Sequence, residues 1–332
     1  MTSYLLEQAS GQLHLLRHRE RIETLLRRED LSKTKRWKLR LVLLTREHAS
    51  EVIGLRRSGA YTTFYETGGQ PIAYNVSAAL KVGLRPKLWR FPIVGALPYL
   101  GFFSKKRAEE ARLRLQRQGL DTYLRPVSAY SSLGFFDDPV YSPMLRSSPD
   151  RLAELVIHES THTTIFLRGR VGFNESLAVF VGQQGTLDLF TRLFGAKSRF
   201  HARAKARFTR SRTFGRLINQ LRKRLLALYA SPISREQKLR ARSAIFVAAQ
   251  ARYRSLFPDS RHWGRFVSQR LNNAIVLSYG RYLEGVEFHQ AVYRCLGRDL
   301  RAMVALYRYA QNFSHPIRYV AKRCHLQTSP RN

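Results

Sequence analysis

The stretch HESTHTTIFLRGRVGFNES, from His158 to Ser176, constrains the fold of this chain more than any other segment. His158 and His162 stand four positions apart, so on a helix their side chains share one face, one turn apart. Glu159 follows the first histidine, and Glu175 comes thirteen residues after the second. A turn at 169–172 would let a second helix return antiparallel and bring Glu175 to the two histidines.

Two imidazoles and a carboxylate in this spacing are a donor set that suits zinc, and catalytic zinc sites leave a fourth position for water. Glu159 stands beside the first ligand, where a carboxylate can take a proton from that water. The sequence therefore predicts a Zn²⁺ site with His158, His162 and Glu175 as ligands and Glu159 as general base. The same donors can hold iron or other ions. The alternative interpretation is a polar face on a solvated helix.

The charge of the chain points to a second class of function. Its 332 residues include 58 Lys+Arg and 23 Asp+Glu, a net charge of +35. Such a charge attracts nucleic acid, anionic lipid or acidic partners. The basic residues are spread along the whole chain. The alternative interpretation, in which most of these side chains are solvated and bind no partner, therefore fits equally well.

The most basic segment, residues 197–243, carries 15 Lys/Arg and one acid, Glu236. Its apolar stripe predicts a helical hairpin that turns near Ser231-Pro232, with inward residues Leu217, Leu221, Leu225 and Leu228. Its aromatic residues are too sparse for a base-stacking platform, and it holds no glycine-rich phosphate loop.

Local signals predict the remaining elements. Residues 3–57 are expected to be helical, with a break at 31–35, and residues 104–119 form an amphipathic helix. Short strands are expected between residues 58 and 136. Ser148-Pro149-Asp150 is typical of a helix start, and Asn174 could cap a following helix that begins at Glu175.

Cysteine usage and the N-terminus bear on the compartment. Cys295 and Cys324 could form one bridge, which the sequence does not settle, and no CxxC pair exists for a cysteine zinc knuckle. The first residues are not typical of a signal peptide, and the longest apolar run, residues 91–103, is too short to span a bilayer. We expect a cytoplasmic protein, or a periplasmic or membrane-anchored one if a leader precedes the chain.

Several motifs in order along most of the chain carry a family resemblance: GQLHLL, WRFPIVGALPYLGFF, SAYSSLGFFDDPVYS, HESTH, FNESLAVFVG and LNNAIVLSYGRY. With them the chain resembles the bacterial putative aminopeptidase family of HExxH zinc metallopeptidases. The resemblance implies a gluzincin-type ligand set in which Glu175 of FNES, rather than Asp137 or Asp138, is the third ligand. The chain departs from the family at three positions. Between the two histidines, relatives carry apolar residues or alanine where this chain has Ser160 and Thr161. After the second histidine, they carry a glutamine where this chain has Thr163.

Taken together, these features predict an α+β fold that is mainly α. A zincin-like core, with a small mostly antiparallel sheet before the HExxH helix, would carry long helical elaborations. The expected regions are an N-terminal helical segment (1–57), the catalytic core (58–196) and a basic C-terminal helical region (197–332), packed as one integrated domain.

The predicted activity is zinc-dependent hydrolysis of peptide bonds, with an aminopeptidase as the specific form. A tetrahedral oxyanion needs a donor besides zinc, and Tyr282 is assigned that role, with Tyr279 and His289 as alternatives. The strand at 127–132 would pair with the substrate backbone. Asn273 is expected to fix a turn rather than bind substrate.

The group that would recognise a free N-terminal ammonium is left open. No carboxylate outside residues 158–175 stands in a pattern for that task, so Glu66 and Asp138 are only candidates. For Asp137 and Asp138 a turn is the favoured interpretation. The evidence for a zinc peptidase is therefore stronger than the evidence for an aminopeptidase.

The competing hypothesis is an Arg-rich helical protein that binds nucleic acid or anionic membrane and keeps a structural or vestigial metal site. The expected partners are a peptide substrate and, through charge alone, weakly held anionic membrane or nucleic acid. No specific protein partner is predicted.

Overall fold

The computed structural model describes residues 17–91, 95–127, 137–258, 264–283 and 285–327, with the side chains of residues 282 and 283 outside that description. The chain divides into two compact units. The first comprises Met1–Ala73, Val127–Phe208 and Gly285–Asn332, and the second comprises Tyr74–Pro126 and Thr209–Glu284. Each unit is therefore assembled from segments far apart in the sequence.

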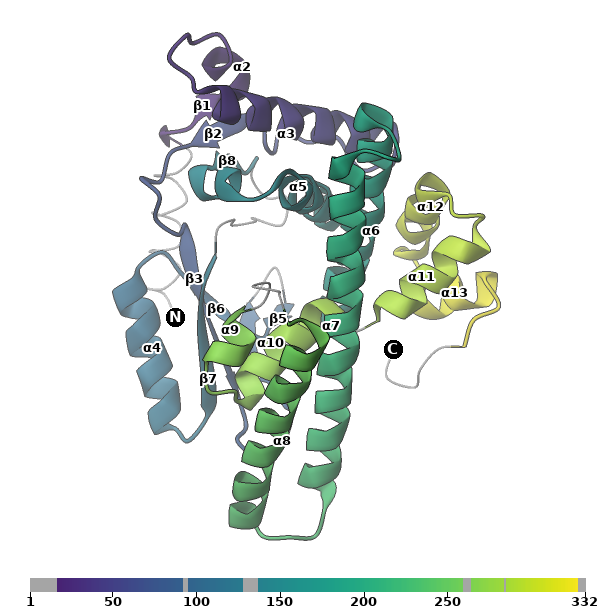
Figure 1. The fold of residues 1–332 in the computed structure, drawn as a ribbon. Coiled ribbons are helices and arrows are strands. Elements are labelled where there is room, and N and C mark those ends of the chain that lie inside the picture. The colour runs from purple at the N-terminus through teal and green to yellow at the C-terminus, as the bar shows by residue number, and fades with distance from the viewer. Residues whose placement is uncertain (1–16, 92–94, 128–136, 259–263, 284, 328–332) are drawn as a thin grey trace. The chain divides into compact units, whose positions relative to one another are not determined.

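The first unit combines a three-stranded sheet with a set of helices (Figure 1). Its elements are β1 (Glu20–Arg21), α2 (Ile22–Leu25), α3 (Lys33–Glu51), β2 (Thr63–Tyr65), β8 (Val140–Tyr141), the 3₁₀ helix η1 (Ser142–Arg146), α5 (Pro149–Thr164), α6 (Val171–Phe194), α11 (Val286–Cys295), α12 (Leu300–Ala310), α13 (Pro316–Arg323) and the start of α7 (Arg199–Ala230). Strand β2 lies between an antiparallel β1 and a parallel β8, with Phe64 opposite Val140.

Helices α5 and α6 form the centre of this unit. They pack against each other, α3 packs against both, and α11 and α12 cover α6 (Figure 1). The apolar faces of these helices meet in one core that includes Ile157, Phe180 and Tyr307. Burial of this apolar surface stabilises the unit. Since α5 and α6 both contribute side chains to this core, the core also fixes the two helices relative to each other.

The second unit holds the other strands and the long helical hairpin. Its elements are β3 (Ala73–Ala79), β4 (Trp89–Phe91), β5 (Gly95–Leu97), β6 (Leu100–Phe102), α4 (Lys105–Arg117), β7 (Asp121–Val127), the rest of α7, α8 (Arg235–Leu256), α9 (Gly264–Ser268) and α10 (Asn273–Leu283). The strands make a β6-β3-β7 sheet and a β4-β5 pair. Its core joins α7, α8 and α10 around Phe214, Leu221 and Tyr253.

The expected α+β, mainly α fold is confirmed, and so are several local signals. Ser104 caps α4, and Pro149 stands at the start of α5. The basic segment forms the expected hairpin of α7 and α8, and its stripe residues Leu217, Leu221 and Leu225 are buried.

The N-terminal region differs in part from the helical segment expected over residues 3–57. Residues 20 and 21 form β1 because their backbone pairs with β2, a partner more than forty residues away. The predicted break at 31–35 is the start of α3, where the Ser32 hydroxyl accepts a hydrogen bond from the Lys35 amide. Residues 1–16 lie outside the described part of the chain.

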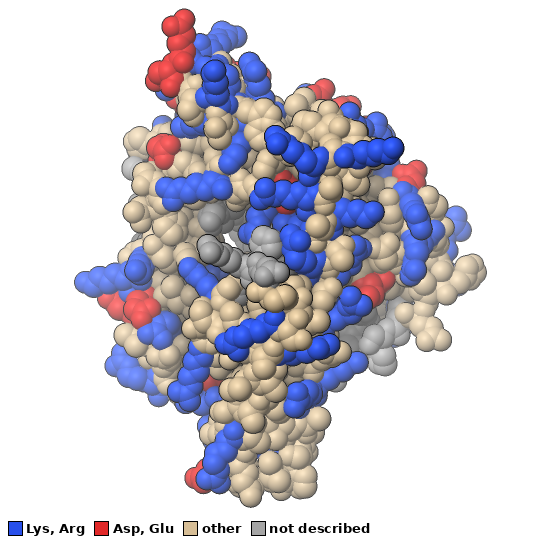
Figure 2. Space-filling model, viewed as in Figure 1, with Lys and Arg blue, Asp and Glu red and all other residues tan. Residues whose placement is uncertain are grey.

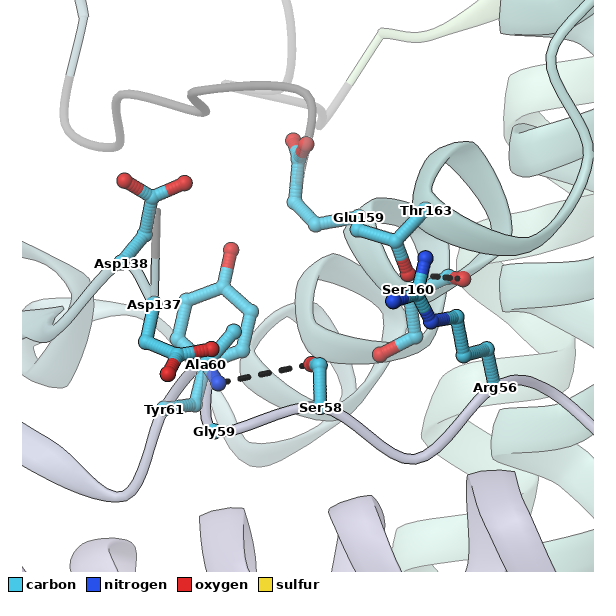
Figure 3. Close-up of a pocket in the computed structure, with 10 residues that line it drawn as sticks. All are labelled: Arg56, Ser58, Gly59, Ala60, Tyr61, Asp137, Asp138, Glu159, Ser160 and Thr163. Carbon is cyan, nitrogen blue, oxygen red and sulfur yellow. Dashed lines mark hydrogen bonds between the residues drawn. The ribbon is translucent and has the colours of Figure 1, made fainter. Parts of the chain in front are cut away.

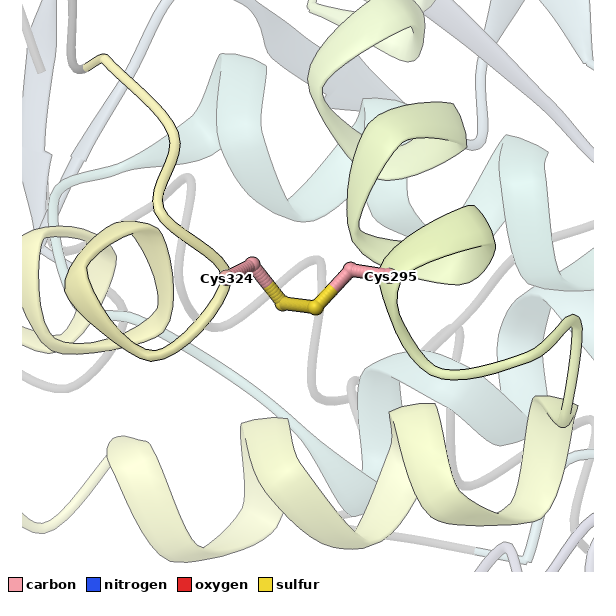
Figure 4. Close-up of a disulfide and its surroundings, with 2 residues drawn as sticks. All are labelled: Cys295 and Cys324. Carbon is pink, nitrogen blue, oxygen red and sulfur yellow. A yellow bond between two sulfur atoms is a disulfide. The ribbon is translucent and has the colours of Figure 1, made fainter.

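Cys295 and Cys324 form a disulfide that joins the end of α11 to the residue after α13 (Figure 4). The bond closes a loop with a sequence separation of 29 residues. It therefore ties the three C-terminal helices into one piece.

Among the described residues, no helix combines the length and the apolar character needed to cross a membrane.

Candidate metal centre

Helix α5 is held in place by ion pairs with the basic segment. The Asp150 carboxylate, in the first turn of α5, is almost fully buried and is bound by Arg207 of α7. Arg207 also pairs with Glu154, one turn further along α5. A buried carboxylate needs such a partner, so these contacts fix the helix that carries the two histidines.

The two histidines and Glu175 come together as their spacing predicts. The Nε2 atoms of His158 and His162 lie 3.1 Å apart. Glu175 Oε2, from α6, lies 3.5 Å from His158 Nε2 and 3.9 Å from His162 Nε2. The three side chains are 12%, 6% and 14% exposed, so the cluster is closed on most sides.

These distances fit a metal ion. Ligand bonds of about 2.0–2.1 Å at tetrahedral angles put ligand atoms about 3.3 Å apart, close to the spacing of these three atoms. Among the described residues, this is the one group of three or more His, Cys, Asp or Glu side chains whose ligand atoms converge in this way. The donor set of two imidazoles and one carboxylate also suits zinc.

Two features of α6 bring Glu175 to the histidines. A Cβ at Gly182 would lie 3.0 Å from the Glu154 carbonyl oxygen, so glycine permits the close approach of α5. Asn174 is buried, and its side chain both donates to and accepts from the backbone of Leu167. The expected role of Asn174 as a helix cap is wrong: α6 begins at Val171, and Asn174 instead holds the preceding loop.

The two histidines differ in their tendency to hold a proton. Burial alone would lower the pKa of His158, but the hydrogen bond to Glu175 and the charges of Glu159 and Glu175 outweigh it and raise that pKa above 6.5. For His162 burial dominates and lowers the pKa. Its Nδ1 is buried without a hydrogen-bond partner in the described part of the chain. A neutral imidazole is the form that binds a metal.

Glu159, which follows His158 in sequence, lines a pocket (Figure 3). The pocket has a volume of about 210 Å³ and is lined by Arg56, Ser58, Gly59, Ala60, Tyr61, Asp137, Asp138, Glu159, Ser160 and Thr163. The Glu159 carboxylate extends towards the side on which the Tyr61 hydroxyl and the Asp138 carboxylate lie (Figure 3). A proton acceptor, a hydroxyl and further carboxylates therefore share one pocket.

Of the three candidate oxyanion donors, the structure describes the side chains of Tyr279 and His289. The Tyr282 side chain lies outside the described residues. Tyr279 packs edge-on against Phe214 and Phe266 in the second unit. His289 is fully buried, and its nitrogens bond Ser176 and Tyr307, while burial lowers its pKa to about 3.

Other expected contacts can also be placed. Asn273 donates to the carbonyl oxygens of Leu80 and Lys81, which confirms that it fixes a turn. Glu66 is exposed and pairs with Lys35, 3.4 Å away. Of the strand at 127–132, residues 128–132 lie outside the described part of the chain, so pairing with substrate there stays a prediction.

Tyr61 is one of the pocket residues that the sequence did not reveal. It lies about a hundred positions before Glu159, in a segment of glycine, tyrosine and threonine without a motif. Its φ of 60° is in the left-handed region, which a bulky side chain adopts at a cost of about 1–2 kcal/mol. No residue pattern predicts such a conformation, so the position of Tyr61 follows only from the structure.

A comparison with protein families gives one match that covers nearly the whole chain. The model described as "Putative aminopeptidase" matches residues 3–318. No curated protein and no solved structure matches the chain.

Proposed function

Because the chain belongs to the putative aminopeptidase family, we propose that it is a zinc-dependent peptidase that acts as an aminopeptidase. The observation that carries the proposal is the convergence of the ligand atoms of His158, His162 and Glu175 within 4.8 Å of one another. The helix pair α5–α6 then forms a zincin-like core of the gluzincin type.

In this proposal His158, His162 and Glu175 hold the metal. A zinc ion in such a site supplies Lewis acidity and an ionisable water. The closed surroundings of the three side chains keep bulk water away from the ligands and strengthen each electrostatic contact. The ion pairs of Asp150 and Glu154 with Arg207 keep the histidine helix in register.

Glu159 acts as general base. It neighbours a ligand in sequence, but its carboxylate lines the pocket instead of joining the cluster. There an Oε atom accepts a proton from the attacking water and returns it to the nitrogen of the leaving amine. General acid–base help of this kind contributes about 10²–10⁴-fold to a rate.

The competing hypothesis of an anion-binding helical protein gains no support from the charges on the face shown in Figure 2. Lys and Arg side chains are scattered over the visible face rather than gathered in one stripe (Figure 2). Most basic residues of 197–243 are exposed. Such a surface suits weak, salt-sensitive contact with anionic membrane or nucleic acid.

Of the two kinds of compartment expected from the sequence, we favour the oxidising, periplasmic one. The Cys295–Cys324 disulfide is the reason, because such bonds persist in oxidising compartments and are rare in the cytosol. Thiol labelling of the protein taken directly from cells checks this: two free thiols would contradict it.

The test of the activity is metal content and peptidase activity on the same samples of wild type, His162→Ala and Glu159→Gln. We expect about one zinc per chain in wild type and Glu159→Gln, and little in His162→Ala. Activity should be lost in both variants, and Glu159→Gln should keep its fold. Wild-type protein that binds no zinc after repletion would overturn the proposal.

A further inference from the structure

The pocket that Glu159 lines is acidic, although the protein as a whole is strongly basic. The chain carries 58 Lys+Arg against 23 Asp+Glu. The pocket is nevertheless lined by three carboxylates, from Asp137, Asp138 and Glu159, and by one guanidinium, from Arg56. Within the described residues these carboxylates do not converge as metal ligands. Such a pocket attracts a cation in a protein whose overall field repels one.

Two residues shape the acidic side of the pocket. Asp138 is only 4% exposed, and its backbone carbonyl accepts a hydrogen bond of 2.7 Å from the Tyr61 amide. A Cβ at Gly59 would lie 2.2 Å from Asp137 Oδ2, so the missing side chain at Gly59 leaves room for that carboxylate. Asp138 is thus buried and held to residue 61 through its backbone, whereas Asp137 is exposed and its carboxylate lies over Gly59.

Tyr61 gives an independent indication of a ligand. The residue is 3% exposed, and its hydroxyl points between the carboxylates of Asp138 and Glu159 (Figure 3). Nowhere in the described part of the chain does this hydroxyl make a hydrogen bond. Its left-handed backbone is unusual for tyrosine, and such strain persists where the surroundings demand it.

The charges beside Tyr61 show which kind of group it can receive. Burial, followed by the negative charges of Glu159 and Asp138, raises its pKa well above the usual value of 10.0, so the hydroxyl keeps its proton. Carboxylates on two sides would oppose an oxyanion at this position. They would stabilise an ammonium, to which a tyrosine oxygen can also act as acceptor.

Substrate geometry links this position to the reaction. The α-nitrogen of an amino-terminal residue is separated by two bonds, about 2.5 Å, from the carbonyl carbon of the first peptide bond. The group that binds a free α-ammonium must therefore line the same pocket as the general base. Asp138 and Tyr61 satisfy that condition with Glu159. Glu66, the other candidate, does not line this pocket, and its carboxylate faces Lys35.

We propose that this pocket binds the free α-ammonium of the substrate, with the Asp138 carboxylate and the Tyr61 hydroxyl as its acceptors. The inference rests on the proposed aminopeptidase function and makes it more specific, because it names the residues that recognise the unblocked amino terminus. Asp137 adds negative potential at the pocket edge.

The first experiment compares amino-acid p-nitroanilides, with leucine and alanine, in free-amine and N-acetylated form. For wild type we expect acetylation to lower kcat/KM by about 100-fold or more, because the acetylated nitrogen carries no positive charge for the carboxylate to stabilise. Calorimetry with leucinamide and N-acetyl-leucinamide measures the same preference as binding, without turnover.

The second experiment uses variants. Asp138→Asn should lower kcat/KM for the free-amine substrate by about 100-fold and change that for the acetylated one by less than about threefold. Tyr61→Phe removes only the hydroxyl and should lower the free-amine value about tenfold. Glu66→Gln is the matched control and should leave both values unchanged. If circular dichroism shows that Asp138→Asn is unfolded, Tyr61→Phe alone tests the proposal.

The outcomes separate the two claims. Zinc-bound wild type that cleaves free and acetylated substrates equally would overturn the ammonium site and leave the peptidase intact. A preference for the free amine that survives both Asp138→Asn and Tyr61→Phe would also overturn it. Wild type that cleaves none of these anilides or any longer peptide would count against the peptidase itself, and leucinamide binding would still decide the ammonium site.

Discussion

The helix pair α5–α6 and the hairpin α7–α8 use charge in opposite ways. The pair carries few ionisable groups, but those of the cluster and Asp150 are largely buried and contact one another or Arg207. The hairpin segment 197–243 carries 15 Lys/Arg, most of them exposed. The comparison teaches that the number of charges in a segment says little about its role, whereas their burial and partners say much.

The largest expected effect comes from one charge in the helix pair. Glu175→Gln keeps the shape of the side chain but removes the negative charge of the third ligand. We expect zinc affinity to fall by more than about 100-fold, and activity to fall with it. Competition with a chelator measures the affinity.

The neighbouring position provides the control for that variant. Ser176→Ala removes a hydroxyl that bonds His289 and does not join the cluster, so it should keep the metal. Equal zinc affinity in Glu175→Gln and wild type would show that the cluster is not the metal site.

A second variant tests whether a single arginine of the basic segment accounts for much of that segment's contribution to the stability of the folded protein. Arg207→Gln leaves the buried carboxylate of Asp150 without its main partner, and we expect a loss of about 3–5 kcal/mol in the free energy of unfolding. Arg203 lies 3.6 Å from the same carboxylate but is 64% exposed, so Arg203→Gln should change stability by less than about 1 kcal/mol. Urea unfolding of both variants tests the difference, and similar losses would remove the distinction between buried and exposed arginines.

The same ion pair has a pH signature. Burial alone would raise the pKa of Asp150, but the charge of Arg207 and hydrogen bonds from Ser148 and Arg207 outweigh it and lower the pKa below 3.8. A lowered pKa in the folded state stabilises the protein above the unfolded-state pKa of about 3.9, and this contribution is lost as pH falls through the folded value. The stability gap between wild type and Arg207→Gln should therefore be constant from pH 5 to 7 and shrink below about pH 4. A gap that persisted to about pH 2 would assign the loss to packing instead.

The smallest effect is expected from exposed charges of the hairpin. A triple variant, Arg212→Gln, Lys223→Gln and Arg224→Gln, should change stability by no more than about 0.5 kcal/mol per site and leave peptidase activity unaltered. It should weaken any binding to DNA or anionic vesicles at low salt. A loss of activity would mean that the hairpin contributes to the reaction after all.

Local patterns predicted much of this molecule. The spacing of His158, His162 and Glu175 predicted their convergence, because a helix repeats every 3.6 residues and a short loop returns the next helix. Pro149 marked the start of α5 for a similarly local reason.

What the sequence did not reveal depends on contacts between distant segments. Tertiary packing determines three such features: the pairing of β1 with β2, the hydrogen bonds between Asn174 and Leu167, and the disulfide. The pocket is a sharper case, since Tyr61, Asp138 and Glu159 come from three separate segments. Asp138 was one of two candidate acids, with Glu66, until the fold placed it beside Tyr61.

The Cys295–Cys324 bond has a consequence for the unfolded chain. By closing a loop with a separation of 29 residues, it restricts the disordered ensemble and stabilises the folded state by about 3–4 kcal/mol in the chain-entropy account. That stabilisation reaches α11, whose His289 bonds the residue next to Glu175. A protease cut anywhere between the two cysteines would also leave both fragments joined, so α13 could not diffuse away from the helix that supports the cluster.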